Sequence, residues 1–114
     1  MAKSVTIYHN PKCTTSCNVL AMIEASGAEP KVVEYLKAGW TKPRLKALFA
    51  AAGLTPREAM RKRAAEELGI GEKATAAQIL DAMVENPVLV ERPFVETSKG
   101  TRLCRPKEMV RELL

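Results

Sequence analysis

Short β-rich segments lie near both ends of this 114-residue chain, and the stretch between them has only helical patterns. Residues 5–8 alternate and are β-rich, and residues 31–35 form a second predicted strand with two valines at its centre. Residues 94–97 and 101–104 are two more predicted strands, joined by Ser98-Lys99-Gly100, a loop typical of a hairpin. With a helix after the first strand and another after the last, the order is β-α-β, a helical block, then β-β-α. This order predicts an α/β fold.

Cap residues and apolar spacing predict where the helices begin and end. The clearest starts are the Thr55-Pro56 pair and the capping box formed by Thr75 and Gln78. The predicted helices cover, in order, Thr15–Ser26, residues 41–53, 55–69 and 75–86, and a final segment from Pro106. No strand is predicted between residues 41 and 86, so we expect one domain over residues 1–114 with a helical insertion at about 41–86.

The composition is that of an ordinary soluble protein, with 46% hydrophobic and 27% charged residues. No apolar run approaches the ~20 residues that a membrane span needs, and no signal peptide precedes Val5. We therefore expect a cytoplasmic protein, in which thiols are mostly reduced.

Cys13 is placed where the first strand ends and the first helix begins. Residues 9–12 break the strand, and Thr14-Thr15-Ser16 offers N-cap chemistry for the helix. A thiol at a helix N-terminus feels the partial positive charge of the free N–H groups, and Lys12 and His9 are nearby cations or potential cations. These features favour a thiolate nucleophile. The alternative is a small buried residue at a turn.

The remaining cysteines do not form a recognisable framework or metal site. Cys13, Cys17 and Cys104 lack the C-x-x-C pairs or the Cys/His clusters of zinc proteins, so no metal is expected. Cys104 lies inside a predicted strand, where a buried and inert thiol is expected.

The net charge of +5 suits an anionic partner. Arg61-Lys62-Arg63 is one basic cluster, and Arg92, Arg102 and Arg105 form a late group. No stacking aromatic residues lie between them, and no nucleic-acid motif is present. A small oxyanion therefore explains these arginines better than a polynucleotide does, although any one of them could be solvated surface charge.

The chain resembles the thioredoxin fold in its element order, and it resembles the glutaredoxin-linked arsenate reductases from end to end, without the longer C-terminal tail of some members. The matching stretches are Ile7-Tyr8-His9-Asn10-Pro11 leading into Cys13, the Arg61-Lys62 pair, Glu91-Arg92-Pro93, and the run from Gly100 to Pro106. Each stretch alone is weak evidence, whereas all of them in the family's order and spacing are strong evidence.

The resemblance implies a role for each matching residue. It makes Cys13 the catalytic cysteine, His9 and Ser16 residues that favour its thiolate, and Pro93 a cis-proline that faces it. The substrate-binding arginines that it implies are Arg61, Arg92 and Arg105.

The resemblance also implies the reaction and its partners. Cys13 would attack arsenate, glutathione would add to the arsenic, glutaredoxin would remove the glutathione, and arsenite would leave. Glutathione is then a co-substrate, no cofactor is bound, neither nucleic acid nor a membrane is a partner, and the protein is expected to be a monomer.

Cys17 departs from the family pattern, which commonly has arginine at this position. A second thiol four residues after Cys13 could be a resolving partner. On a regular helix, however, the Cβ bonds of the two cysteines point along the axis rather than toward each other. A packed, helix-lining thiol and a redox partner both remain possible interpretations of Cys17.

Two other functions are compatible with this scaffold. One is a different thiol-dependent reductase, and the other is a transcription regulator of the Spx type, which the absence of C-x-x-C disfavours. A phosphatase-like arsenate reductase needs C-x5-R, but Val19 occupies the position of that arginine.

Overall fold

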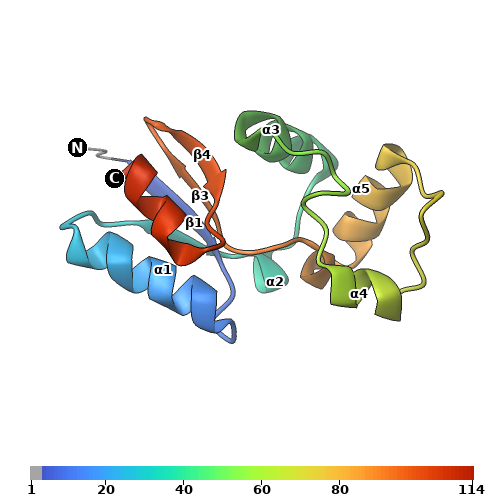
Figure 1. The fold of residues 1–114 in the computed structure, drawn as a ribbon, viewed down its shortest axis with the longest axis horizontal. Coiled ribbons are helices and arrows are strands. Elements are labelled where there is room, and N and C mark those ends of the chain that lie inside the picture. Colours follow the sequence, from blue (N-terminus) through green and yellow to red (C-terminus); the bar gives the residue numbers. More distant parts are fainter. Residues whose placement is uncertain (1–3) are drawn as a thin grey trace. The chain divides into compact units, whose positions relative to one another are not determined.

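A computed structural model describes residues 4–114, and it has a mixed four-stranded sheet. The strands are β1 (Val5–His9), β2 (Lys31–Glu34), β3 (Phe94–Thr97) and β4 (Gly100–Leu103). They lie in the order β2-β1-β3-β4, with β1 parallel to β2 and antiparallel to β3, and with β3 antiparallel to β4 (Figure 1). The sheet confirms the α/β prediction and its β-α-β, then β-β-α, order.

Contacts along the chain separate two compact units. One consists of the described residues up to Ala38 together with Arg92–Leu114, and the other of Gly39–Glu91. The first unit contains the whole sheet and Cys13, whereas the second consists of helices and connecting turns.

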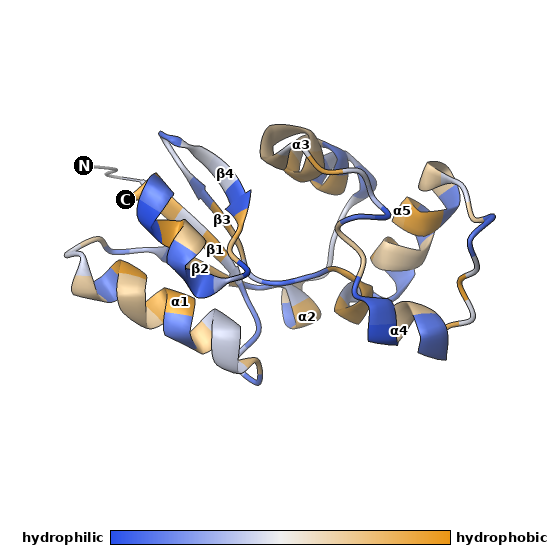
Figure 2. Ribbon diagram, viewed as in Figure 1, coloured by the Kyte–Doolittle hydropathy of each residue, from blue (hydrophilic) through white to orange (hydrophobic). Residues whose placement is uncertain are grey.

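In the first unit, two helices and one face of the sheet share a hydrophobic core. The helices are α1 (Thr14–Ala25) and η2 (Lys107–Leu113), which contact each other. The buried core residues are Val5, Ile7, Val19, Ile23, Val95, Cys104, Val110 and Leu113. Figure 2 shows apolar residues on both helices. Burial of these side chains holds α1 on the sheet, which fixes where the helix starts after β1.

Several element boundaries in this unit differ from the sequence-based predictions, and three of the differences have a clear cause or change the type of element. β2 ends at Glu34, because Tyr35 is fully buried at the start of a short helix, α2 (Tyr35–Ala38). β4 ends at Leu103, one residue before the predicted end. The Cys104 N–H still donates to the Pro93 carbonyl at 2.9 Å, but Pro93 has no N–H to donate in return, so the ladder stops. The final segment is a 3₁₀-helix from Lys107.

The second unit contains α3 (Lys42–Ala52), α4 (Lys62–Glu67), α5 (Ala76–Glu85) and the 3₁₀ turn η1 (Pro87–Leu89). α5 contacts both α3 and η1, and α4 contacts η1. The predicted capping box is confirmed: the Thr75 hydroxyl accepts from the Gln78 N–H, and the Gln78 side chain accepts from the Thr75 N–H. Gly53 ends α3 with φ of 71°, a conformation that favours glycine.

The helical segment predicted for residues 55–69 is interrupted. Residues 56–59 form turns, Met60 pairs with Val90 in an isolated β-bridge, and α4 begins only at Lys62. The Arg61 N–H donates to the Leu89 carbonyl, and the Glu91 N–H donates to the Ala59 carbonyl, each at 2.8 Å. These bonds to a distant segment hold Met60 and Arg61 in an extended conformation, which local helix propensity does not anticipate.

Candidate active site around Cys13

A hydrogen-bonded turn connects β1 to the first residue of the candidate site. The Cys13 N–H donates to the Asn10 carbonyl at 3.0 Å, and the Asn10 side-chain oxygen accepts from the Lys12 N–H at 2.9 Å. Sequence analysis did not single out Asn10, although an Asn-Pro pair is a known turn signal. The turn delivers Cys13 directly to the start of α1.

Cys13 is itself the N-cap residue of α1, with φ of −97° and ψ of 119°. The prediction that residues 14–16 supply the cap was therefore wrong by one to three positions. The Cys13 carbonyl accepts the first helical hydrogen bond, from the Cys17 N–H at 3.0 Å. A thiol at this position faces the free N–H groups of the first turn, where a negative charge is stabilised.

The side chains of His9 and Ser16 bond to each other beside the turn. The His9 Nδ1 and the Ser16 Oγ are 2.6 Å apart, and the same hydroxyl accepts from the Asn10 N–H at 3.1 Å. Both residues are buried. These buried hydrogen bonds hold the turn in place. The Ser16 hydroxyl is engaged in them and does not cap the helix.

Burial lowers the pKa of His9 below its ordinary value, although the charge of Glu34 opposes this shift. The imidazole is therefore neutral near pH 7. His9 does not supply the extra positive charge near Cys13 that the sequence suggested, and its contribution is the hydrogen bond to Ser16.

Arg92 and Arg105 come from distant parts of the sequence to the Cys13 thiol. The Arg105 Nη1 lies 3.9 Å from the Cys13 Sγ and also donates to the Arg92 carbonyl at 3.1 Å. Arg92 precedes Pro93, and the peptide bond between them is cis, as the resemblance implied. The Arg105–Pro106 bond is also cis, which the sequence analysis did not anticipate.

The pKa of the Cys13 thiol is lowered by this environment. Burial alone raises it, but the Ser16 backbone N–H, the charge of Arg92 and hydrogen bonds from Arg92 and Arg105 outweigh burial. The thiolate is therefore present at a lower pH than for an ordinary cysteine, which makes Cys13 a stronger candidate nucleophile.

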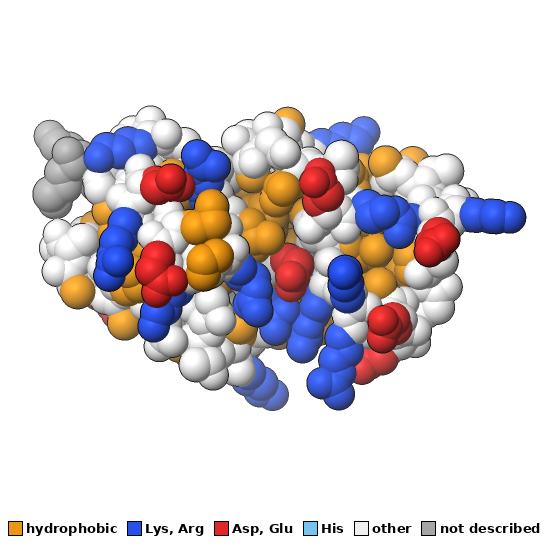
Figure 3. Space-filling model, in the orientation of Figure 1, with side chains coloured by type: hydrophobic (Ala, Val, Ile, Leu, Met, Phe, Trp, Pro, Cys, Tyr) orange, Lys and Arg blue, Asp and Glu red, His pale blue; other side chains and the backbone are white. Residues whose placement is uncertain are grey.

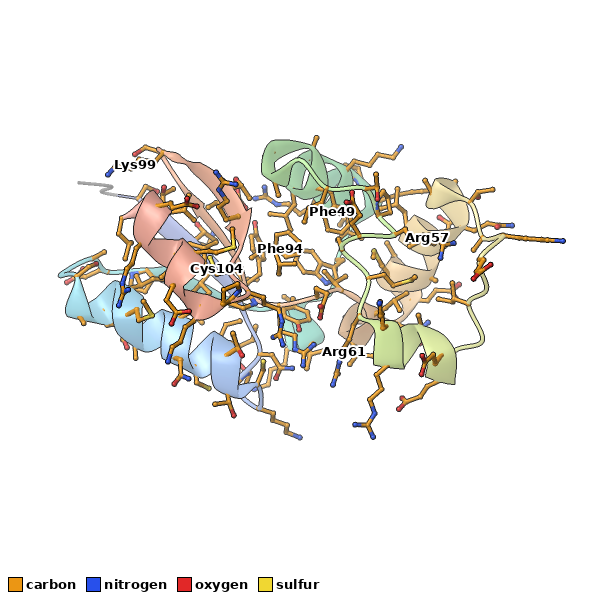
Figure 4. The ribbon with its side chains drawn as sticks, in the orientation of Figure 1. Phe49, Arg57, Arg61, Phe94, Lys99 and Cys104 are labelled. Carbon is orange, nitrogen blue, oxygen red and sulfur yellow. The ribbon has the colours of Figure 1, made fainter. Side chains whose placement is uncertain are left out.

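Arg61 lies in the second unit, where it is the half-buried N-cap residue of α4 (Figure 4). Its backbone N–H is used in the bond to Leu89. A contact between Arg61 and an oxyanion at Cys13 stays a prediction.

Cys17 is an exposed free thiol, and its S–H donates to the Pro11 carbonyl at 3.3 Å. Cys104 is also free, but it is fully buried (Figure 4), and burial raises its pKa to about 12. A buried and inert Cys104 was predicted. The predicted strand included this residue, whereas β4 ends one residue before it.

Among residues 4–114, no group of three or more His, Cys, Asp or Glu side chains is placed to hold a metal ion. Within the same residues, every helix is too short or too polar to cross a membrane.

A family model described as "ArsC family" matches residues 8–113, which include the turn, Cys13 and all three candidate arginines. The chain belongs to the ArsC family. The family predicted from the resemblance is therefore confirmed.

Several ArsC relatives are similar over nearly the whole chain. A protein named arsenate reductase ArsI2 from Synechocystis is 62% identical over 113 residues, covering 96% of this chain and 81% of the relative. The arsenate reductase of Escherichia coli K12 is 46% identical over 114 residues, covering 97% of this chain and 81% of the relative.

A solved structure of an arsenate reductase from Vibrio cholerae superposes with a TM-score of 0.92. The match covers 100% of both chains at 38% sequence identity. The thioredoxin-like fold predicted for this ArsC chain is thereby confirmed.

Proposed function

We propose that this ArsC family protein is an arsenate reductase in which the Cys13 thiolate attacks arsenate. The observation that carries the proposal is a thiol at a helix N-terminus with the Arg105 Nη1 3.9 Å from its sulfur. This environment, with the Ser16 N–H and Arg92, lowers the pKa of the thiol. The names of the similar proteins from Synechocystis and Escherichia coli support arsenate as the substrate.

The arginines reduce the electrostatic repulsion between arsenate and the thiolate. Arsenate, like phosphate, carries about 1.5 to 2 negative charges near neutral pH, so it repels a thiolate. Guanidinium groups offset that charge and hold two oxygens at once in a forked geometry that lysine cannot match. Arg92 and Arg105 are assigned this role together with Arg61, which is included because it matches the family pattern.

The proposed reaction conserves atoms and electrons in four steps. The Cys13 thiolate forms a bond to arsenic, and one arsenate oxygen leaves as water after protonation. The thiol of glutathione then displaces a second oxygen as water. Next, a glutaredoxin thiolate attacks the glutathione sulfur, the sulfur–arsenic electron pair stays on arsenic, and As(V) becomes As(III). Water then adds to arsenic and the bond between arsenic and the Cys13 sulfur breaks, which releases arsenite and returns the Cys13 thiolate.

The same mechanism assigns roles to the residues around Cys13 and a cellular location to the protein. His9 and Ser16 hold the turn that presents Cys13, and Pro93 lies between Arg92 and β3. Glutathione and glutaredoxin are cytoplasmic thiols in reduced form, so a cytoplasmic monomer without a bound cofactor is the proposed state. The helical stretch at about 41–86 is proposed to be an insertion within one thioredoxin-like domain.

The deciding experiment measures arsenate-dependent NADPH oxidation by the purified protein with glutathione, glutaredoxin and glutathione reductase. The expected result is turnover that requires every component and disappears in Cys13→Ser. Turnover of a glutathione-linked disulfide without any arsenate-dependent rate would instead identify a different thiol-dependent reductase.

A further inference from the structure

A small pocket lies on the outer side of the turn that precedes Cys13. It has a volume of about 220 Å³, and all of its lining belongs to the first unit. The turn contributes Asn10, Pro11 and Lys12, and the junction of β2 with α2 contributes Glu34, Leu36 and Lys37. The mechanism proposed above uses none of these side chains as a reacting group.

The pocket combines an apolar wall with charges of both signs. Leu36 leaves 41% of its surface exposed, which makes it one of the few large hydrophobic residues that face solvent in the described chain. The Lys37 Nζ is 3.7 Å from the Glu34 Oε1, and both side chains are substantially exposed. An exposed pair of this kind contributes little stability, so both charges are available to a ligand.

We propose that this pocket binds one end of glutathione, the reductant in the function proposed above, on which this inference rests. Glutathione has two carboxylates, one ammonium group and a central thiol. Lys12 and Lys37 complement a carboxylate, Glu34 complements the ammonium group, and Leu36 and Pro11 contact the hydrocarbon parts. The volume is below the ~300 Å³ of pockets that enclose a whole drug-sized ligand, so it fits one end of the tripeptide.

The position of the pocket suits attack at arsenic on Cys13. Lys12 immediately precedes Cys13, and consecutive Cα atoms are about 3.8 Å apart. A tripeptide with one end at Lys12 and Lys37 therefore has its central thiol within reach of the Cys13 sulfur. The residues that line this pocket do not include Arg92 or Arg105, so the substrate and the reductant can be bound together.

A second pocket, of about 480 Å³, is lined by Thr15 and Asn18 of α1 and by residues 105–108. It is less suitable for the reductant, because its Arg105 already donates to the Cys13 Sγ and to the Arg92 carbonyl. A carboxylate bound there would compete with arsenate for the same guanidinium group.

Steady-state kinetics test the assignment through a charge reversal. We expect Lys37→Glu to raise the KM for glutathione about three- to tenfold, as for the loss and reversal of one exposed charge contact. The KM for arsenate should stay within about twofold of wild type. Lys46→Glu, an exposed site on α3 in the second unit, makes the same change in net charge and is the matched control. Equal KM values for glutathione in the two variants would overturn the proposal and leave the arsenate reductase function intact.

Binding without arsenate separates this inference from the proposed function. S-methylglutathione, which cannot react, is titrated into the ¹⁵N-labelled wild-type protein and followed by NMR. We expect the largest shifts at the amides of Lys12, Leu36 and Lys37, and small shifts at Asn18 and Lys107. The same pattern in a protein without arsenate turnover would contradict the proposed function but support the pocket. The largest shifts at Asn18 and Lys107, or no shifts at all, would overturn the pocket assignment.

Discussion

Cys13 and Cys104 are both buried thiols of the same unit, with 8% and 0% of their surfaces exposed, yet their pKa values are shifted in opposite directions. Burial disfavours the thiolate at both sites. At Cys104 it dominates, even though the charge of Arg102 opposes it. At Cys13, the first turn of α1 and two guanidinium groups outweigh burial.

The difference shows that direct donors, more than exposure, make a thiol of this protein reactive. Cys104 follows a strand and packs in the hydrophobic core, whereas Cys13 caps a helix and receives a bond from Arg105. Figure 3 shows acidic side chains among the basic ones on the face that it draws, so a net charge of +5 does not by itself identify a reactive site.

The largest effect on turnover is expected from the loss of Cys13, with the loss of Cys104 as the comparison. Cys13→Ser should lower arsenate turnover by at least about 10³-fold, because it removes the nucleophile. Cys104→Ala should keep turnover within about twofold and lower the free energy of unfolding by about 1 kcal/mol, because it removes a buried sulfur. Coupled turnover assays and urea unfolding measure the two effects. A dispensable Cys13 with an essential Cys104 would reverse the comparison.

The next largest effect on catalysis is expected from the arginine near Cys13, and the arginine near Cys104 serves for comparison. Arg105→Ala should lower kcat/KM for arsenate by about 10²- to 10³-fold, since it removes a donor to the Cys13 sulfur that we propose also binds the oxyanion. Arg102→Ala is the matched control. Arg102 pairs with Glu112 at 3.5 Å on the exposed surface, so its loss should change kcat/KM by less than about twofold. Equal losses in both variants would indicate a general effect of charge rather than a specific site.

The pH dependence of alkylation tests the pKa difference directly. The reaction of Cys13 with iodoacetamide should rise with pH through a midpoint below that of an ordinary cysteine and level off above it. Arg105→Ala should move that midpoint to higher pH. Cys104, with a pKa of about 12 and no exposed surface, should stay unmodified in the folded protein. Peptide mass spectrometry identifies the labelled cysteine, and labelling of Cys104 before Cys13 would contradict the assignment.

The same shift links the ionisation of Cys13 to folding. Because the folded-state pKa is below the unfolded-state pKa, the thiolate stabilises the folded protein above the unfolded-state pKa. This contribution is lost as the pH falls through the folded-state pKa. We therefore expect the melting temperature of wild type relative to Cys13→Ser to decrease from alkaline to neutral pH, and a pH-independent difference would contradict the linkage.

The smallest effect is expected at Cys17. Its exposed S–H donates only to the Pro11 carbonyl, and a bond to the Cys13 sulfur would require the first turn of α1 to open. Each backbone hydrogen bond lost in that opening costs about 1 kcal/mol. Cys17→Ser should therefore retain most of the glutathione-supported turnover.

The Cys17 prediction is checked with glutathione and glutaredoxin, and separately with thioredoxin. Two results together would show that the protein is a dithiol reductase: Cys17→Ser is as inactive as Cys13→Ser, and mass spectrometry of the wild type after one turnover shows a Cys13–Cys17 disulfide. The proposed mechanism, in which glutathione is the resolving thiol, would then be wrong.

Local sequence signals predicted the elements whose stabilising contacts are close in sequence. The alternation around Ile7 predicted β1, and the Thr75–Gln78 capping box predicted α5 with Thr75 as its N-cap. Cys13 was placed correctly between β1 and α1, because an Asn-Pro turn and a helix start both depend on a few neighbouring residues.

Tertiary structure decided the features that depend on distant partners. Met60 joins a β-bridge with Val90 instead of continuing a helix, and β4 stops at Leu103 because its next partner is Pro93. Arg105 reaches Cys13 across 92 residues of sequence, and the burial of His9 makes it neutral rather than an additional cation. The sequence by itself determined which residue types stand at the strand-to-helix turn. Only the folded chain decided their ionisation, because pKa values depend on burial and on charges that distant segments bring together.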